Sequence, residues 1–419
     1  MKIDRRSFLA LAGSTGLTLG LPGWLRGAQA AEPFQGPYWV FIDAGGGWDP
    51  TMLCDPKGKA TSDAINPINN FLTDEILSIG AFSIAPVDGH QAFFERFQNE
   101  LLVINGIDAQ TVSHETGNRH TWSGLTDPNT PSLGALLAAT ASPQPSLSFL
   151  SFGGYDRTAG LVAPTRIPDS NSVNDLAYPY RMNSTDPDSV LYPDAIMDRL
   201  AEARTARLER QLGQATLPRE ARALEMFRQA HSGENELAEL AIHLPEALDN
   251  SANPLYRQAE MAMAAFKAGV TVCANLHIGG FDTHDNHDTN QSDALAELLL
   301  GVSYVMDEAE RQGIADQIIV AVGSEFGRTP FYNADNGKDH WPITSMMLMG
   351  PGISGGRVIG GTDDEQLAKL VNPTTLVEDP SGVAITPGHI HAALRELAGI
   401  QADPLSQPWD VGSSLPLLG

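Results

Sequence analysis

The sequence has 419 residues, a formal net charge of −25 at pH 7 and two cysteines. A surface this acidic disfavours DNA, RNA and anionic membranes as partners, and an anionic substrate would need a local positive centre, either arginine or a metal ion. The length fits one large α/β domain or two ordinary ones. No apolar run of about 18 residues follows the N-terminal segment, so the sequence predicts no membrane span in the mature chain.

The N-terminal segment has the three-part layout of an export signal. Arg5 and Arg6 form a twin-arginine pair, an uncharged apolar run continues to about Pro22, and residues 28–30 read Ala-Gln-Ala, a small-residue cleavage site. Glycines within the short run argue against a membrane anchor. We therefore expect a signal peptide over residues 1–30 and a mature chain over 31–419. The twin-arginine route would deliver the folded protein to the periplasm or to the outside of the cell.

Buried strands alternate with helices along the mature chain, and they predict an α/β fold. Residues 194–249 show a helical pattern, which we expect to pack on the domain as a lobe. Strands that are apolar along their whole length favour a doubly wound, largely parallel sheet flanked by helices. Strands are predicted around residues 38–42, 101–106, 147–152, 270–277, 317–322, 344–349 and 358, and helices around 133–141, 254–267, 288–312 and 387–397.

Acidic and imidazole side chains follow the ends of several predicted strands, where sheets of this kind place their ligands. A single aspartate after a strand is usually a cap, but residues 282–288, Asp-Thr-His-Asp-Asn-His-Asp, are too rich in polar groups for turn chemistry alone. Carboxylates together with imidazoles suit a divalent metal such as Zn or Mn better than Ca or Mg. The candidate metal ligands are Asp43, Asp282, His284, His287, Glu325 and His340.

Four motifs carry a resemblance to a known superfamily. They lie at residues 43–49 (Asp-Ala-Gly-Gly-Gly-Trp-Asp), 280–284 (Gly-Phe-Asp-Thr-His), 324–330 (Ser-Glu-Phe-Gly-Arg-Thr-Pro) and 339–342 (Asp-His-Trp-Pro). In this order they resemble the alkaline phosphatase and sulfatase superfamily, and in particular its twin-arginine-exported bacterial branch, a sulfatase-like domain of unknown function. The resemblance implies an alkaline phosphatase-like fold and a metal-dependent hydrolase of phosphate or sulfate esters. Its substrate would be an anionic small molecule or a glycan ester.

The resemblance also implies a nucleophile at the start of the helix that follows the second strand. Counting back from Trp122 leads to Ser113 or His114, with Thr116 as the next choice. A hydroxyl is a weak nucleophile unless a metal lowers its pKa, so a water molecule is the alternative. Arg119 and Arg328 could clamp an anion. The candidate catalytic residues are therefore Ser113, Thr116, Arg119 and Arg328.

Two departures from the superfamily pattern favour a second hypothesis. Glu325-Phe326 stands where an Asp-His or Asp-Asn pair is expected, and the Cys/Ser-x-Pro-x-Arg signature of sulfatases is absent. The alternative is a non-catalytic protein that binds a glycan or a partner protein in a degenerate cleft. The sequence also leaves open whether Cys54 and Cys273 form a disulfide in an oxidising compartment or remain separate thiols.

Overall fold

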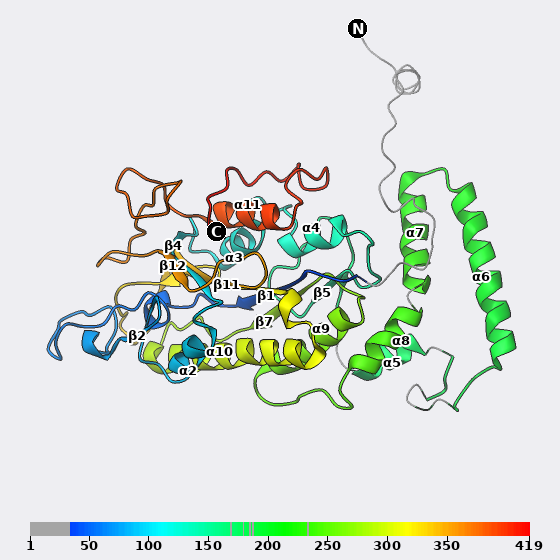
Figure 1. The fold of residues 1–419 in the computed structure, drawn as a ribbon, viewed down its shortest axis with the longest axis horizontal. Coiled ribbons are helices and arrows are strands. Elements are labelled where there is room, and N and C mark those ends of the chain that lie inside the picture. Colours follow the sequence, from blue (N-terminus) through cyan, green and yellow to red (C-terminus); the bar gives the residue numbers. More distant parts are fainter. Residues whose placement is uncertain (1–33, 168–169, 179, 184–185, 187, 233) are drawn as a thin grey trace, which may run out of the picture.

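The computed structural model describes residues 34–419, apart from 168–169, 179, 184–185, 187 and 233. The predicted export signal lies outside the described residues. An eight-stranded sheet crosses the described part of the chain (Figure 1). In spatial order its strands are β12 (Arg357–Gly360), β4 (Leu102–Asp108), β11 (Ile343–Met349), β8 (Ile318–Gly323), β1 (Tyr38–Ala44), β7 (Cys273–Ile278), β5 (Phe149–Ser151) and β6 (Pro164–Thr165).

The sheet is mostly parallel, as the sequence predicted. Only β11 runs antiparallel to its neighbours β4 and β8, while the other pairs in this sheet are parallel. Side chains of β1 alternate between two apolar cores: Val40 and Ile42 enter the core on one face, and Trp39 and Phe41 enter the core on the other. A strand covered on both faces has to be apolar throughout, and this explains the continuous apolar run in the sequence.

Helices cover both faces of the sheet (Figure 1). On one face α9 begins at Pro254, directly after Asn253, whose side chain accepts the backbone N–H of Leu255, and α10 ends before Gly313 in the left-handed conformation. The helices of this face are α2 (His90–Phe97), α9 (Pro254–Lys267) and α10 (His287–Gln312). Those of the opposite face are α3 (His114–Ser123), α4 (Leu133–Thr140) and α11 (Pro387–Leu397). The fold is therefore α/β with helices on both sides of a mixed sheet.

A group of helices lies at one end of the sheet and its flanking helices, at the right of Figure 1. It comprises α5 (Ser170–Ala177), α6 (Asp194–Gln214), α7 (Pro218–Ser232) and α8 (Glu234–His243). Helix α8 packs against α5 and α9, whereas α6 and α7 pack against each other and project away from the sheet. The segment for which the sequence predicts a helical lobe thus forms α6, α7 and α8 in the structure.

Both cysteines are free thiols buried in the apolar cores. The Cys273 thiol donates to the carbonyl of Gly134 at 3.1 Å, and the Cys54 thiol faces the Asn105 amide oxygen at 3.3 Å. Burial raises the pKa of both thiols, so neither is activated as a nucleophile. Of the alternatives that the sequence left open, the structure has the separate thiols. Among the described helices, none combines the length and the apolarity that crossing a bilayer requires.

Candidate functional site

The ends of β1, β7 and β8 bring the candidate residues to one edge of the sheet. Parallel pairing aligns Asp43 of β1 with His277 of β7 and with Gly323 of β8. The loops that follow these three strands therefore start side by side, as expected at the carboxyl ends of parallel strands. They supply the glycine loop 44–47, residues 279–287 and residues 324–328. Strand β10 (His340–Trp341), which carries His340, lies at the same edge of the sheet because it pairs with β9 (Gly327–Arg328).

The glycine loop after β1 is held by side chains from the loop after β8. Gly46 N–H donates to Glu325 Oε1 at 2.9 Å, and Gly47 N–H donates to the Ser324 hydroxyl at 3.1 Å. On the other side of the loop, the guanidinium of Arg328 donates to the carbonyl oxygens of Gly46 and Gly47. This buried arginine thus cross-links the loop, and it is not free to clamp a substrate anion.

Glycine is required at position 46 by both conformation and space. Gly46 has φ +125°, and a Cβ there would lie 2.4 Å from the backbone nitrogen of Asp282. We expect Gly46→Ala to lower the free energy of unfolding by about 1–3 kcal/mol, measured by denaturant titration. Gly279→Ala is the matched control, because its nearest neighbour would be His277 Nε2 at 3.9 Å. Equal stabilities of the two variants would contradict this packing.

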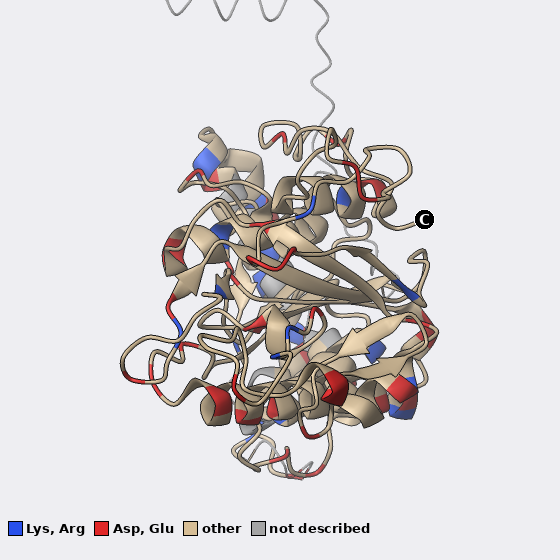
Figure 2. Cartoon of the chain, turned by 90° about the vertical axis from the view of Figure 1, so that its left-hand side faces the viewer, with Lys and Arg blue, Asp and Glu red and all other residues tan. Residues whose placement is uncertain are grey.

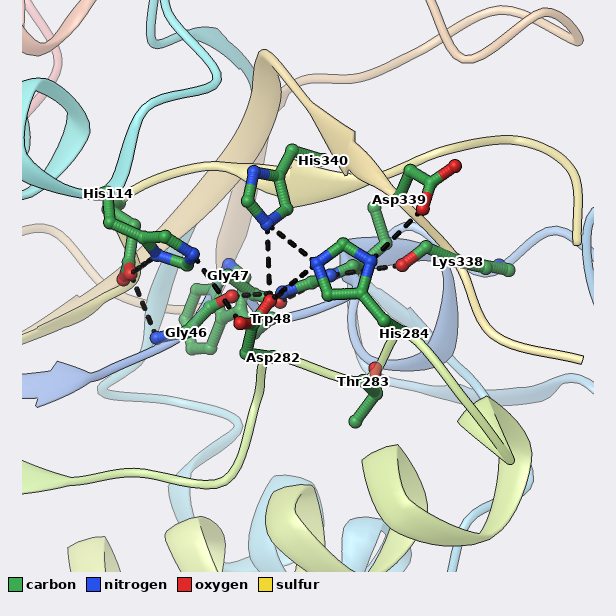
Figure 3. A network of polar contacts seen from close by, with 12 residues as sticks. Gly46, Gly47, Trp48, His114, Asp282, Thr283, His284, Lys338, Asp339 and His340 are labelled. Atoms are coloured by element: carbon green, nitrogen blue, oxygen red, sulfur yellow. Dashed lines mark hydrogen bonds and ion pairs between the residues drawn. The ribbon is translucent and has the colours of Figure 1, made fainter. Parts of the chain in front are cut away.

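Asp282 lies at the centre of the site, and three imidazoles surround it (Figure 3). Its Oδ1 is 3.0 Å from His284 Nε2 and 3.2 Å from His340 Nε2, and its Oδ2 is 3.5 Å from His114 Nε2. Arg328 also donates to Oδ1, at 2.7 Å. Partial burial acts to raise the pKa of Asp282, but its contacts with Arg328 and with the neighbouring imidazoles outweigh it, so the pKa is lowered and the carboxylate stays ionised.

The Nδ1 atom of each imidazole contacts a group that accepts hydrogen bonds. His340 Nδ1 donates to the Val112 carbonyl at 2.8 Å. His284 Nδ1 donates to Asp339 Oδ1 at 3.0 Å, a contact that helps to lower the pKa of Asp339, and His114 Nδ1 donates to the Glu325 carboxylate at 2.9 Å. A neutral imidazole that donates through Nδ1 carries a lone pair on Nε2. All of these lone pairs point toward Asp282.

This arrangement of acceptors fits a metal ion. His284 Nε2 and His340 Nε2 lie 3.0 Å apart, so two lone pairs face each other beside an ionised carboxylate. A metal cation between the two nitrogens makes that contact favourable, as does a single proton on one of them. Donors bound at about 2.1 Å, and at roughly 90–100° to one another, lie about 3.0–3.2 Å apart. The spacings of Asp282, His284 and His340 match this value, and atoms of His114, Asp282 and His340 lie within 4.8 Å of one another.

The other predicted metal ligands do not face this cluster. Asp43 is buried and its carboxylate contacts Trp122 and His277. Glu325 lies directly behind His114, where it orients that imidazole instead of presenting its own oxygens to the centre. His287 is fully buried on α10 and contacts the Asp49 carboxylate through Nε2. The structure thus brings Asp282, His284 and His340 together with His114, and it places Asp43, His287 and Glu325 around them.

His287 belongs to a buried polar network beneath the glycine loop. Asp49 Oδ2 accepts the Lys338 ammonium at 2.6 Å and lies 2.9 Å from His287 Nε2, and none of these side chains is exposed. Lys338 also donates to the Asn69 amide oxygen at 2.8 Å. Sequence reasoning missed Asp49 and Lys338, although Asp49 lies within the motif at residues 43–49 and Lys338 directly precedes the motif at 339–342. The network connects the glycine loop to α10 and to the strand that carries His340.

The predicted catalytic residues, apart from Arg328, lie outside the imidazole cluster. Ser113 precedes α3 as its exposed N-cap residue, and Thr116 is half-buried one turn into the helix. Arg119 is buried, and it donates to the Thr126 carbonyl and to Glu115, so its role is to hold the end of α3. His114, the first residue of α3, is the side chain that reaches the centre. The count back from Trp122 had already pointed to this position as one of two choices.

Comparisons with known proteins give a family but no characterised relative. The profile of a family described as "Protein of unknown function (DUF1501)" matches residues 39–380. No curated protein sequence matches the chain.

Solved structures with a similar fold share little sequence with this chain. A structure of Ps i-CgsB in complex with k-i-k-neocarrahexaose is 7% identical, covers 91% of this chain and 75% of its own, and has a TM-score of 0.39. Phosphonate monoester hydrolase of Agrobacterium radiobacter is 11% identical, covers 88% of this chain and 74% of its own, and has a TM-score of 0.34. A 2-O GAG sulfatase is 10% identical, covers 87% of this chain and 71% of its own, and has a TM-score of 0.32. Similarity at this level carries no argument about function, so the site has to be interpreted from its own geometry.

Proposed function

Because this chain belongs to the DUF1501 family of proteins of unknown function, its chemistry has to be inferred from the site, and we propose that it is a metal-dependent hydrolase of phosphate or sulfate esters. The observation that supports this most strongly is the convergence of His114, His284 and His340 on Asp282, with each Nδ1 bound to an acceptor. Carboxylate or carbonyl partners of this kind fix ligand imidazoles in metal sites and raise their basicity.

The donor set favours Zn or Mn among the divalent metals. Nitrogen donors together with one carboxylate suit first-row transition ions, whereas Ca and Mg prefer oxygen ligands alone. His114, Asp282, His284 and His340 would hold the ion. When bound, such a cation supplies Lewis acidity, which stabilises the negative charge that develops on the oxygens of an ester. His114 also opens α3, so the positive end of the helix dipole lies at the same place.

The substrate that fits these charges is an anionic ester, either a small molecule or a substituted glycan. Asp and Glu residues are distributed over many segments of the chain in Figure 2, and Lys and Arg residues are scattered among them. An anion would therefore be held by the cation and not by the surrounding surface. Water is the nucleophile that we favour, since no described contact connects Ser113 or Thr116 with the imidazole cluster. With Arg5 and Arg6 in the predicted signal, we place the activity outside the cytoplasm.

The test combines metal content with turnover. Protein exported by its own signal should contain Zn or Mn by elemental analysis, and it should hydrolyse one class among aryl phosphates, phosphodiesters and aryl sulfates. A chelator should abolish that activity, and the lost metal should restore it. A protein that binds the metal at the cluster but turns over none of these esters would contradict the hydrolase. It would support the alternative, a protein that binds a glycan or a partner protein. The structural contacts of Arg119 and Arg328 favour that alternative, because they leave neither arginine free to bind a substrate anion.

A further inference from the structure

The carboxylate of Asp43 and the imidazole of His277 form a second functional pair at the same edge of the sheet. Asp43 Oδ2 accepts His277 Nδ1–H at 2.8 Å, and Asp43 Oδ1 accepts the Trp122 indole N–H at 2.7 Å. Gln258 of α9 fixes the backbone of His277, because its amide bonds both the N–H and the carbonyl of that residue. Asp43 is 3% exposed. The pair is therefore held from both sides by the core of the protein.

The opposite edge of the His277 ring is open. A Cβ at Gly45 would lie 2.5 Å from His277 Cε1, and a Cβ at Gly153 would lie 2.8 Å from His277 Cβ, so two glycines make room for the ring. The side chain is 37% exposed, and Nε2 has no hydrogen-bond partner among the residues that the structure describes. The hydrogen bond that His277 donates to Asp43 raises the pKa of His277 although burial opposes it, and the charges of Asp43 and Glu325 add to the rise.

The pair and the imidazole cluster share one loop. Gly45 packs against the ring of His277, and the next residue, Gly46, packs against the backbone of Asp282. On the other side of the pair, Gly154 packs against the Asp43 side chain and lines a cavity of about 810 Å³. This cavity also contains polar and aromatic side chains: Asn129, Tyr155, Arg157 and Trp409. The ring of His277 and the cluster are therefore connected through adjacent residues of the glycine loop, and the carboxylate of Glu325, which accepts from His114, also acts on His277 through its charge.

We propose that His277, oriented by Asp43, is the general acid that protonates the leaving group of the ester. This role rests on the hydrolase proposed above. As water attacks the phosphorus or sulfur atom, the bond to the leaving oxygen breaks and that oxygen takes the proton from His277 Nε2. The products are an alcohol and inorganic phosphate or sulfate. The imidazole is neutral after this step, and the proton that the attacking water releases restores the imidazolium; the Asp43 carboxylate remains ionised and stabilises the imidazolium before and after the step.

A general acid matters only when the leaving group needs a proton, so leaving-group dependence tests the role. The experiment compares wild type and His277→Gln on a 4-nitrophenyl ester and on an alkyl ester of the same acid. Gln can still donate to Asp43, which favours folding. We expect the variant to lose about 100- to 10,000-fold in kcat/KM on the alkyl ester, and less than about 10-fold on the nitrophenyl ester. Asp43→Asn should lower kcat/KM on the two substrates in the same pattern as His277→Gln, but by smaller factors.

Metal content separates this proposal from the one on which it rests. Both variants should retain the metal of the wild type, because neither residue belongs to the set of His114, Asp282, His284 and His340 that would hold the ion. The role of His277 would be overturned if the wild type is active and His277→Gln loses kcat/KM equally on both esters, or loses none. Either result would leave the proposed hydrolase intact. A metal-loaded wild type that hydrolyses no ester would overturn both proposals. If His277→Gln does not fold, Asp43→Asn gives the same comparison.

Discussion

Lys338→Met is expected to lower the free energy of unfolding by about 3–5 kcal/mol, because it leaves the buried carboxylate of Asp49 without its cation. In the native protein Lys338 donates to Asp49 at 2.6 Å, and both side chains are fully buried. Burial acts to raise the pKa of Asp49, but Lys338 and His287 outweigh it, so the pKa is lowered. Denaturant titration at neutral pH measures the loss directly.

The pH dependence of this loss follows from the lowered pKa of Asp49. A carboxyl whose pKa is lower in the folded than in the unfolded chain stabilises the fold fully above its ordinary value of about 3.9. That contribution disappears as the pH falls toward the lower pKa of the folded state. The difference between wild type and Lys338→Met should therefore be larger at neutral pH than in acidic buffer, where Asp49 becomes protonated.

Two further variants control this prediction. Lys369→Met removes an exposed ion pair with Glu378 and should cost less than about 1 kcal/mol, because surface pairs are weak. Asp49→Asn combined with Lys338→Met removes both charges and should restore part of the lost stability. If Lys338→Met is no more damaging than Lys369→Met, the buried pair does not hold the site as we describe.

Asp282→Asn is expected to weaken Zn or Mn binding by more than about 100-fold. Mutation of a residue that only hydrogen-bonds to a metal ligand already lowers metal affinity by about 10- to 100-fold, and Asp282 would be a ligand itself. Asp282 contacts the Nε2 atoms of all the converging imidazoles, whereas Glu325 and Asp339 contact Nδ1 atoms. The amide removes the charge but keeps the size, so packing changes little. Calorimetric titration of the metal-free protein with each metal gives the affinity, and ester turnover should disappear in parallel.

Asp285→Asn is the matched control for this variant. Asp285 is an exposed carboxylate in the same loop, and it accepts hydrogen bonds from Asn290 instead of facing the cluster. It should leave both the metal affinity and the turnover unchanged. If the two variants lose affinity to the same extent, the effect is one of overall loop charge, and Asp282 is not a ligand.

The fold could largely be predicted because its signals are local. A strand buried on both faces has a continuous apolar run, as in 38–42, and the helix at 254–267 has the same bounds in sequence and structure. The direction of β11 could not be predicted, since parallel and antiparallel central strands have the same apolar composition. Its reversal depends on the long connection from β8, which contains β9 and β10.

The site could be located from the sequence, but its members could not be distinguished. Asp43 and Asp282 both follow buried strands, yet Asp43 turns toward Trp122 and His277, and Asp282 turns toward the cluster. His284 and His287 are three residues apart, but His287 already belongs to α10, which directs it into the core toward Asp49. These directions depend on partners far away in the chain, and short-range patterns do not encode them.

The residues of the imidazole cluster come from segments that are far apart in the chain, so a cation bound there would prolong the lifetime of the folded protein. His114 follows β4, Asp282 follows β7 and His340 precedes β11, so only a fragment that spans residues 114–340 contains the complete set. A cation that binds all of them binds only the native state, and at one hundred times its Kd it adds about 2.7 kcal/mol to the free energy of unfolding. The supply of that cation would then set how long the folded chain resists proteolysis.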